Sequence, residues 1–305
     1  MTESVSAGTA GDEVPWAATI LREVCREAGL DSSGARLIKF TNNAVYQLAS
    51  APIIVRIPGS IVVSDRAPKV VGVARWLADH AMPAVRLVDA LPQPLTFGGR
   101  RITFWHRVIP SPQAAAPNGR DLGRILRRLH ALPPPPFELP RWTPLRPIRE
   151  RIDEQDILSP SDRHFLEEKC DEIGDQLGEI EYVLPLGPIH GDSSVGNLIP
   201  SGRGAVICDF DSAAYGPREW DLTPVAVGKV RFGSHAGHQQ QLADEYGMDI
   251  LRWQHFSVLR QLRELQLVTS VLPVLKTNPA LFEQWRYRFV SFRTGDTSVN
   301  WTLYR

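Results

Sequence analysis

The sequence predicts an α+β protein with two lobes, in which a small antiparallel sheet is followed by a larger and mainly helical part. Strand-like segments gather between residues 36 and 108. Helical periodicity dominates between residues 121 and 292. Between these regions, Ile109-Pro110-Ser111-Pro112 is typical of a connecting segment. We therefore expect a disordered lead over residues 1–14, an N-terminal lobe over residues 15–108 and a C-terminal lobe over residues 109–305.

The composition excludes several classes of protein. The 305 residues include 34 basic and 34 acidic side chains, so the net charge of zero gives no indication of a nucleic acid or membrane partner. Cys25, Cys170 and Cys208 are too few and too far apart for a disulfide framework or a zinc site. No signal peptide is recognisable, and no apolar run approaches the roughly 20 residues that cross a bilayer. We expect a soluble cytoplasmic protein, and the sequence leaves its oligomeric state open.

The N-terminal lobe is expected to begin with a helix and to continue with strands. Ala18, Leu21, Val24 and Cys25 recur at helical spacing, and Gly29 supplies a stop. The expected elements are a helix over residues 15–28, strands over 36–40, 44–49 and 53–57, a helix over 70–80, and strands over 84–91 and 101–108.

Helices dominate the expected C-terminal lobe. Leu122, Ile125, Leu126 and Leu129 follow the pattern of an amphipathic helix. The expected helices cover residues 121–131, 252–272 and 279–292, and the prolines at 133–136 require an extended connector. Residues 150–181 hold 12 acidic and three basic side chains, which indicates either a solvated helix face or the edge of a pocket for a cationic acceptor.

The stretch from Pro188 to Leu222 carries the residues best suited to chemistry. Asp192 and Asn197 lie five residues apart in a polar loop, and the apolar run at 205–208 ends on Asp209-Phe210-Asp211. This order of loop, strand and loop lets two oxygen-bearing segments meet where a hard cation such as Mg²⁺ is held. Phosphoryl transfer needs a proton acceptor and oxygen ligands for magnesium. Asp192 suits the first role, and Asn197 and Asp209 suit the second.

At this point the sequence resembles a known family. His190-Gly191-Asp192, Asn197 and Asp209-Phe210-Asp211 are similar to the Brenner motif and the metal-binding triplet of the aminoglycoside phosphotransferase and choline kinase-like family. The resemblance implies a bilobal protein kinase-like fold, use of ATP (or GTP) with Mg²⁺, and transfer of the γ-phosphoryl group to a hydroxyl of a small-molecule acceptor, an antibiotic or a metabolite.

The resemblance also assigns roles within this stretch. Asp192 becomes the catalytic base, and Asn197 and Asp209 become the metal ligands. His190 is expected to brace the loop, and Asp211 to be a further ligand or an orienting residue. Asp221 either caps a helix or anchors the backbone of the catalytic loop.

In the N-terminal lobe, the resemblance implies a nucleotide site. Arg56 falls where the family has a lysine on the phosphates, and Asn43 ends the turn of the flap above them. Trp105, Arg107 and Val108 lead into the hinge, whose backbone would meet the nucleotide base. Each has a plainer interpretation: Arg56 as a solvent-facing strand residue, Asn43 as part of a simple connector, and Trp105 as a packed aromatic residue on a strand.

Two features depart from the family or from its usual acceptor. No glutamate occurs between Arg56 and Phe137, so the usual helical partner of the phosphate-binding cation is missing. Asp65 or Asp79 could substitute, or the nucleotide and metal site alone could hold the cation. The last expected helix carries three basic residues, Arg286, Arg288 and Arg293. Such a basic wall would suit a neutral or acidic acceptor better than a polycationic one.

Two further functions remain open at this level. Arg56 and the missing glutamate are compatible with a kinase-like nucleotide-binding or regulatory module without turnover. Asp209 and Asp211 also resemble the nucleophile and acid of an aspartyl phosphohydrolase. Such hydrolases place this pair after the first strand of a doubly wound domain, whereas here it follows a strand-rich region.

Overall fold

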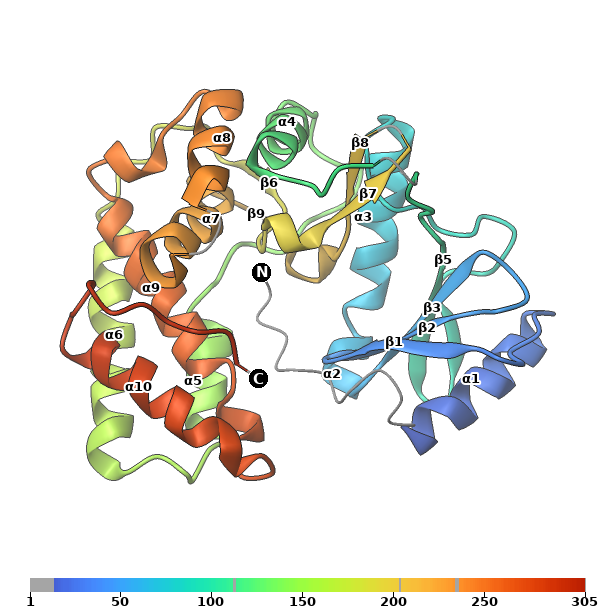
Figure 1. Ribbon diagram of the computed structural model, residues 1–305, viewed down its shortest axis with the longest axis horizontal. Helices are drawn as coiled ribbons and strands as arrows, with labels where there is room; N and C mark the ends of the chain where they lie inside the picture. Colours follow the sequence, from blue (N-terminus) through green and yellow to red (C-terminus); the bar gives the residue numbers. More distant parts are fainter. Residues whose placement is uncertain (1–13, 112–113, 203, 234–235, 305) are drawn as a thin grey trace.

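A computed structural model describes residues 14–111, 114–202, 204–233 and 236–304. The chain forms an α+β fold with two lobes, a sheet with one covering helix and a larger helical part (Figure 1). The lead predicted over residues 1–14 lies outside the described residues except for Val14. The two-lobed α+β fold predicted from the sequence is confirmed.

The N-terminal lobe is built on a five-stranded antiparallel sheet with strand order β1-β2-β3-β5-β4. Helix α1 packs against β3 and β4, and their shared core includes the fully buried Val24, Val55 and Phe104. The elements are α1 (Pro15–Glu27), β1 (Arg36–Phe40), β2 (Asn43–Gln47), β3 (Ile53–Pro58), α2 (Ile61–Ser64), α3 (Ala67–Asp79), β4 (Leu95–Phe97) and β5 (Arg100–His106).

The strand predicted over residues 84–91 is wrong. This segment makes only single bridges, from Ala84 to Ile207 and from Leu87 to Trp105. It is extended, but its successive backbone groups bond to two different hairpins, so no continuous ladder forms. The edge strand of the sheet is instead the short β4, which the sequence analysis missed.

The C-terminal lobe combines helices with two small two-stranded sheets, β6 with β9 and β7 with β8. Its α-helices are α4 (Gly119–His130), α5 (Arg146–Asp153), α6 (Pro160–Gly178), α7 (Glu219–Phe232), α8 (Ala236–Tyr246), α9 (Phe256–Thr269) and α10 (Phe282–Arg293). Its strands are β6 (Gly187–Ile189), β7 (Leu198–Ser201), β8 (Gly204–Ile207) and β9 (Ala214–Gly216). Within the described ranges, no helix is long and apolar enough to cross a bilayer.

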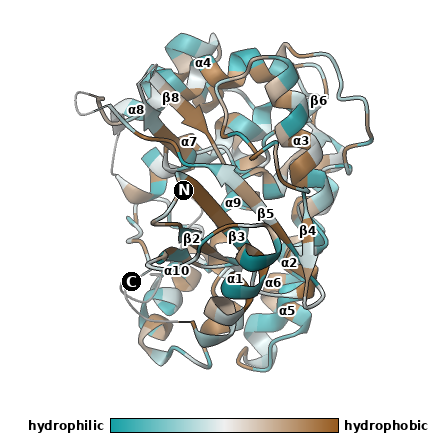
Figure 2. Ribbon diagram, turned by 90° about the vertical axis from the view of Figure 1, so that its right-hand side faces the viewer, coloured by the Kyte–Doolittle hydropathy of each residue, from teal (hydrophilic) through white to brown (hydrophobic). Residues whose placement is uncertain are grey.

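The buried side chains form two clusters whose border does not follow chain order. The smaller cluster lies between α1 and the sheet. The larger cluster fills the C-terminal lobe and also takes in the buried face of α3 and the ring of Trp105. Figure 2 shows hydrophobic colour along strands of the sheet and mixed colours along most helices, which fits helices that bury one side only. Helix α3 therefore ties the two lobes together.

Candidate active site

Asp221, near the start of α7, anchors the loop that follows β6. Its carboxylate accepts hydrogen bonds from the backbone N–H of His190 (2.7 Å) and of Gly191 (2.8 Å). The ring of His130, at the end of α4, lies 3.1 Å from the same carboxylate. Burial alone would raise the pKa of Asp221, but the hydrogen bond and charge of His130 and the charge of His190 outweigh it and hold this pKa below its ordinary value. The geometry matches the anchoring role considered for Asp221.

Gly191 allows the anchored loop to touch the segment after β8. Its φ angle of 82° lies in the left-handed region, and a Cβ atom would come 2.1 Å from the carbonyl oxygen of Ser212. No other residue fits here without moving one of the two backbones. The loop is also held by the ring N–H of Trp220, which donates to the carbonyl of Gly191 at 2.8 Å.

Asp192 is 6% exposed, and its two carboxylate oxygens have different surroundings. Oδ1 accepts a hydrogen bond from Nη2 of Arg263, on α9, at 3.0 Å. Oδ2 is buried and accepts no hydrogen bond within the described residues. The side chain of Asn197 donates to the backbone carbonyl of Asp192 at 2.8 Å. One carboxylate oxygen is thus fixed in place, and the other is left to accept a proton.

The hairpin of β7 and β8 brings Asn197 next to the aspartate triplet. Leu198 pairs with Ile207, and the N–H of Cys208 donates to the carbonyl of Asn197 at 2.9 Å. Asn197 and Asp209 therefore stand at the same open end of the hairpin. The side-chain amide of Asn197 is oriented with its nitrogen on Asp192, so its oxygen stays available to a cation.

Asp209 occupies a strained backbone conformation at φ 70° and ψ 70°, which non-glycine residues rarely adopt. Burial raises the pKa of its carboxyl group, and the negative charges of Asp211 and Asp192 add to the shift, while Arg56 opposes it. Within the described residues, no three acidic, histidine or cysteine side chains gather closely enough to hold a metal ion by themselves. Asp209 and the amide oxygen of Asn197 are two hard oxygen donors, and a bound cation would take its other ligands from phosphates and water. These residues fit a divalent cation such as Mg²⁺.

The N-terminal lobe brings a cation and an amide group to the same triplet. Arg56, on β3, lies 2.5 Å from Asp211 and 3.6 Å from Asp209, with its side chain only 16% exposed. Asn43, the first residue of β2, reaches Asp211 at 3.5 Å. The structure therefore rules out a solvent-facing Arg56 and brings Arg56 and Asn43 to the candidate metal site.

Helix α3 presents a lysine, and not a glutamate, to this site. Lys69 donates to the backbone carbonyls of Asp211 (2.6 Å) and Ala213 (3.0 Å), and burial lowers its pKa to about 8. Substitution of the missing glutamate by Asp65 or Asp79 is wrong, because Asp65 pairs with Arg101 and Asp79 is exposed. The aspartates of the triplet hold Arg56 instead.

The three expected hinge residues differ in which of their polar groups stay available to a nucleotide base. The ring of Trp105 is 4% exposed, bonds to Thr103 at 2.9 Å and packs against Phe210, so its side chain is a packed one. The N–H of Arg107 is used by Pro52 at 2.8 Å. Within the described residues, the backbone of Val108 makes no hydrogen bond. Val108 is therefore the best placed of the three for base recognition, which stays a prediction.

The basic wall expected on the last helix is wrong. Arg286 and Arg293, on α10, both pair with Asp162 on α6, at 3.3 and 2.8 Å. Arg288 is buried, with its guanidinium 3.6 Å from the ring centre of Tyr304. These charges hold the C-terminal helices together, because their partners are internal.

Sequence reasoning missed three residues that shape the site: Arg263, Lys69 and His130. His130 contacts Asp221 and, at 2.8 Å, Tyr246. Arg263 lies 71 residues from Asp192 along the chain. The only local indication of its role in the sequence is that this charged residue directly follows Leu262, which lies on the buried face of the helix.

Comparison with known proteins places this geometry in a family. The family model described as "Phosphotransferase enzyme family" matches residues 37–265. No curated protein matches the sequence. An amicoumacin kinase, solved in complex with AMP-PNP, Ca²⁺ and Ami, has a TM-score of 0.73 at 14% identity, over 94% of this chain and 97% of that one.

Other solved structures give the same result. The choline kinase LicA from Streptococcus pneumoniae has a TM-score of 0.65 at 12% identity, over 91% of this chain and 98% of that one. The GDP and kanamycin complex of APH(2″)-IIia has a TM-score of 0.63 at 14% identity, again over 91% and 98%. These likenesses show the kinase-like fold, and the matched family model covers well over half of the sequence. The chain belongs to the phosphotransferase enzyme family.

Proposed function

We propose that the protein transfers the terminal phosphoryl group of a nucleoside triphosphate to a hydroxyl group of a small molecule, with Asp192 as the catalytic base. The observation that carries the proposal is the buried Oδ2 of Asp192, which has no hydrogen bond within the described residues and lies in the loop joined to Asn197 and to the triplet. A base needs one free oxygen and a fixed orientation, and Arg263 supplies the second.

The reaction follows from these positions. The acceptor oxygen forms a bond to the terminal phosphorus while the bond from phosphorus to the bridging oxygen of the nucleotide breaks. The hydroxyl proton passes to Oδ2 of Asp192, and the nucleoside diphosphate leaves. Asn197 and Asp209 would hold Mg²⁺, which would neutralise the negative charge of the phosphates. Arg56 and Asn43 approach the site from the sheet, where they would contact the phosphates.

Relatives of the same fold support nucleotide use and small-molecule acceptors. One was solved with AMP-PNP and Ca²⁺ and another with GDP and kanamycin, so both adenine and guanine nucleotides occur among them. We propose ATP or GTP with Mg²⁺ as the donor for this chain. The phosphohydrolase alternative loses its basis, because the sheet is antiparallel and not doubly wound.

The experiment measures release of nucleoside diphosphate against a panel of hydroxylated metabolites and antibiotics, with wild-type protein and Asp192→Asn. We expect an acceptor-dependent rate that falls by about 10²–10⁴-fold in the variant, the usual contribution of a general base. Equal rates in both proteins would exclude Asp192 as the base.

A catalytically silent module is the second candidate, because Arg56 is held by the triplet where a helical glutamate would normally hold the cation. Calorimetric titration of the protein with the magnesium nucleotide distinguishes the two. Tight, magnesium-dependent binding without turnover for any acceptor would favour the module.

A further inference from the structure

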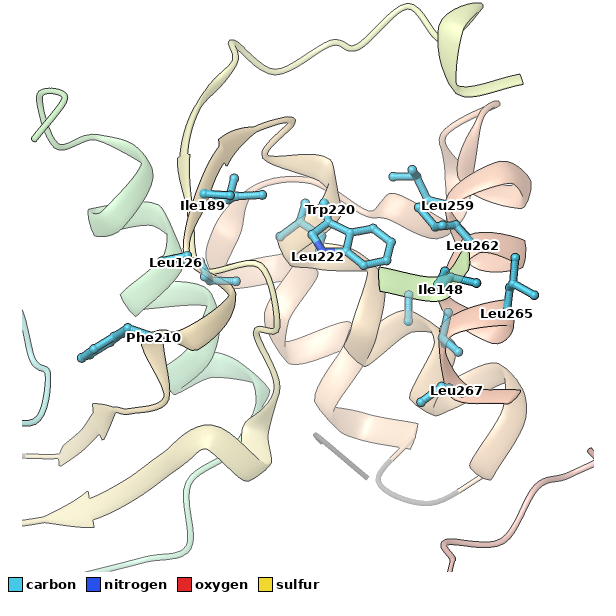
Figure 3. Packing of buried hydrophobic residues seen from close by; sticks show 14 of the residues in the cluster. Leu126, Ile148, Ile189, Phe210, Trp220, Leu222, Leu259, Leu262, Leu265 and Leu267 are labelled. Atoms are coloured by element: carbon cyan, nitrogen blue, oxygen red, sulfur yellow. The ribbon is translucent and has the colours of Figure 1, made fainter. Parts of the chain in front are cut away.

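Helices α5 and α9 pack together, and α9 carries Arg263 to the candidate site. Ile148 of α5 is fully buried and belongs to the same cluster as Leu262 and Leu265 of α9. Figure 3 shows Ile148 beside these two leucines. Arg151 lies one helical turn after Ile148, and Arg263 directly follows Leu262. The packed core therefore holds these two arginines in a fixed relation.

Arg151 has cations as neighbours and lacks a carboxylate partner. Its Nε atom is buried and has no hydrogen-bond partner within the described residues. Burial and the positive charges of Arg66 and Arg263 together lower its pKa to about 10, although the negative charge of Glu150 opposes the shift. Glu150 is engaged elsewhere, since it pairs with Arg146 at 2.9 Å.

Arg66 reaches the same region from the opposite lobe. It is the residue directly before α3, and it is half-buried. Its positive charge acts on Lys69 and Asp211 as well as on Arg151, so Arg66 lies near charged side chains of both lobes. In the described part of the chain, no carboxylate forms an ion pair with Arg66 or Arg151. Arg66, Arg151 and Arg263 form what we call the arginine cluster.

Arg263 brings the cluster to the acceptor side of the site, whereas the charge of Arg66 also acts on Asp211. Arg263 contacts Asp192, the residue that receives the acceptor hydroxyl, whereas Arg56 contacts the triplet that would hold the metal and the nucleotide. An acceptor with ammonium groups would meet three like charges beside Asp192. An acceptor with an anionic group would supply the ion-pair partner that Arg66 and Arg151 lack within the described residues, and guanidinium groups bind carboxylates and phosphates in a two-pronged geometry.

We propose that the acceptor is a hydroxylated small molecule that carries a carboxylate or phosphate group, and that the arginine cluster holds this group. The inference rests on the function proposed above, because it names the acceptor class of the same site. It assigns Arg66 and Arg151 to acceptor recognition and gives Arg263 a second role beside its contact with Asp192.

The test uses two series of probes that differ only in charge: gluconate, sorbitol and glucamine, and glycerate, glycerol and aminopropanediol. Turnover of each is measured with the magnesium nucleotide, together with any acceptor found in the panel. We expect kcat/KM for the anionic member of each series to exceed that of the neutral member by about 10-fold or more, the effect of one charged hydrogen bond. The ammonium members should be poorest.

Variants locate the effect. Arg66→Gln and Arg151→Gln should each raise KM for the anionic probe by about 10-fold, with KM for the nucleotide and the rate with the neutral probe nearly unchanged. Arg151→Lys should recover part of the loss, because it keeps the charge. Arg252→Gln is the matched control, since this arginine is exposed and pairs only loosely with Asp249 at 3.5 Å. Thermal melting checks that each variant is folded.

The outcomes separate the inference from the proposed function. Preference for neutral or ammonium probes, with turnover that still depends on Asp192, would overturn the anionic acceptor and leave phosphoryl transfer intact. A rise in KM for the nucleotide in place of the acceptor would assign the cluster to the donor and would also overturn it. Absence of turnover with every probe and every panel member would overturn both the anionic acceptor and the proposed phosphoryl transfer.

Discussion

Asp221 and Asp209 are two aspartates beside one catalytic loop, and their carboxylates are satisfied to different degrees. Asp221 is fully buried, accepts two backbone N–H groups and contacts His130. Asp209 is half-buried in a strained conformation, and its nearest cation, Arg56, is 3.6 Å away. The pKa of Asp221 is lowered, and that of Asp209 is raised. The fully bonded carboxylate holds the loop in place, and the less fully bonded one is the metal ligand that we propose.

The largest effect is expected from Asp221→Asn, which tests the satisfied member of the pair. The side-chain amide of the variant would point an N–H group at the backbone N–H donors of the loop, and the buried hydrogen-bond network would be broken. We expect the free energy of unfolding to fall by about 3 kcal/mol and turnover to be lost. Urea denaturation measures the first. A loss below about 1 kcal/mol would mean that the network contributes little.

Asp209→Asn tests the unsatisfied member. Magnesium-dependent nucleotide binding and turnover should fall by about 10²-fold or more, because a charged ligand of the cation is removed. The free energy of unfolding should stay within about 1 kcal/mol of wild type, since no well-bonded group is lost. Isothermal titration with the magnesium nucleotide and urea denaturation give the two values. A large loss of stability with unchanged binding would reverse the comparison.

Arg56→Gln sharpens the comparison by removing the cation that faces Asp209 and Asp211. We expect KM for the nucleotide to rise by about 10- to 100-fold, the effect of losing a charged hydrogen bond to phosphate. Steady-state kinetics at varied nucleotide concentration measure it. Unchanged KM would show that Arg56 serves only the two aspartates.

Lys69 gives a pH signature beside the same triplet. Its pKa is about 8 in the folded protein, against 10.5 as the ordinary value, so the unfolded chain binds the proton more tightly. The free energy of unfolding should therefore rise with pH between about 8 and 10.5 relative to Lys69→Met. Below that window, this difference in pH dependence between the two proteins should be absent. Urea denaturation of both proteins across this range measures the difference. Parallel pH profiles would contradict the burial of Lys69.

The smallest effect is expected from Arg286→Gln on α10. Its partner Asp162 also binds Arg293, and its side chain is 49% exposed, so the free energy of unfolding should change by less than about 1 kcal/mol. Acceptor KM should stay the same, which steady-state kinetics would check. An increase in KM for the acceptor would contradict this prediction and would indicate that α10 does line the acceptor site.

Local patterns in the sequence predicted much of the fold and part of the site. The strand at 36–40 matches β1 at both ends, and the stop at Gly29 follows α1 closely, because backbone propensity and side-chain spacing act over a few residues. The loop, strand and loop order around Asp192 and Asp209 also predicted that two oxygen-bearing loops would meet, although the hairpin of β7 and β8 that joins them was not predicted. That order is a local feature, since a short hairpin has few ways to close.

Contacts between distant segments could not be predicted in the same way. The basic residues of the last helix resembled a free wall, but their partner is an acid on α6, more than 100 residues earlier. Arg263 gave no sign that it would contact Asp192. A charged side chain has the same local pattern whether it faces water or an ion pair, because its partner is chosen only when the helices pack.

The close contact at Gly191 limits how this site can change over generations. With no side chain between its Cα and the carbonyl of Ser212, the segments of Asp192 and Asp209 rest directly on each other. Any substitution at position 191 would displace both acids at once, so neither could be adjusted separately for a new substrate. New acceptor preferences would have to arise elsewhere, on the helices that surround the pair.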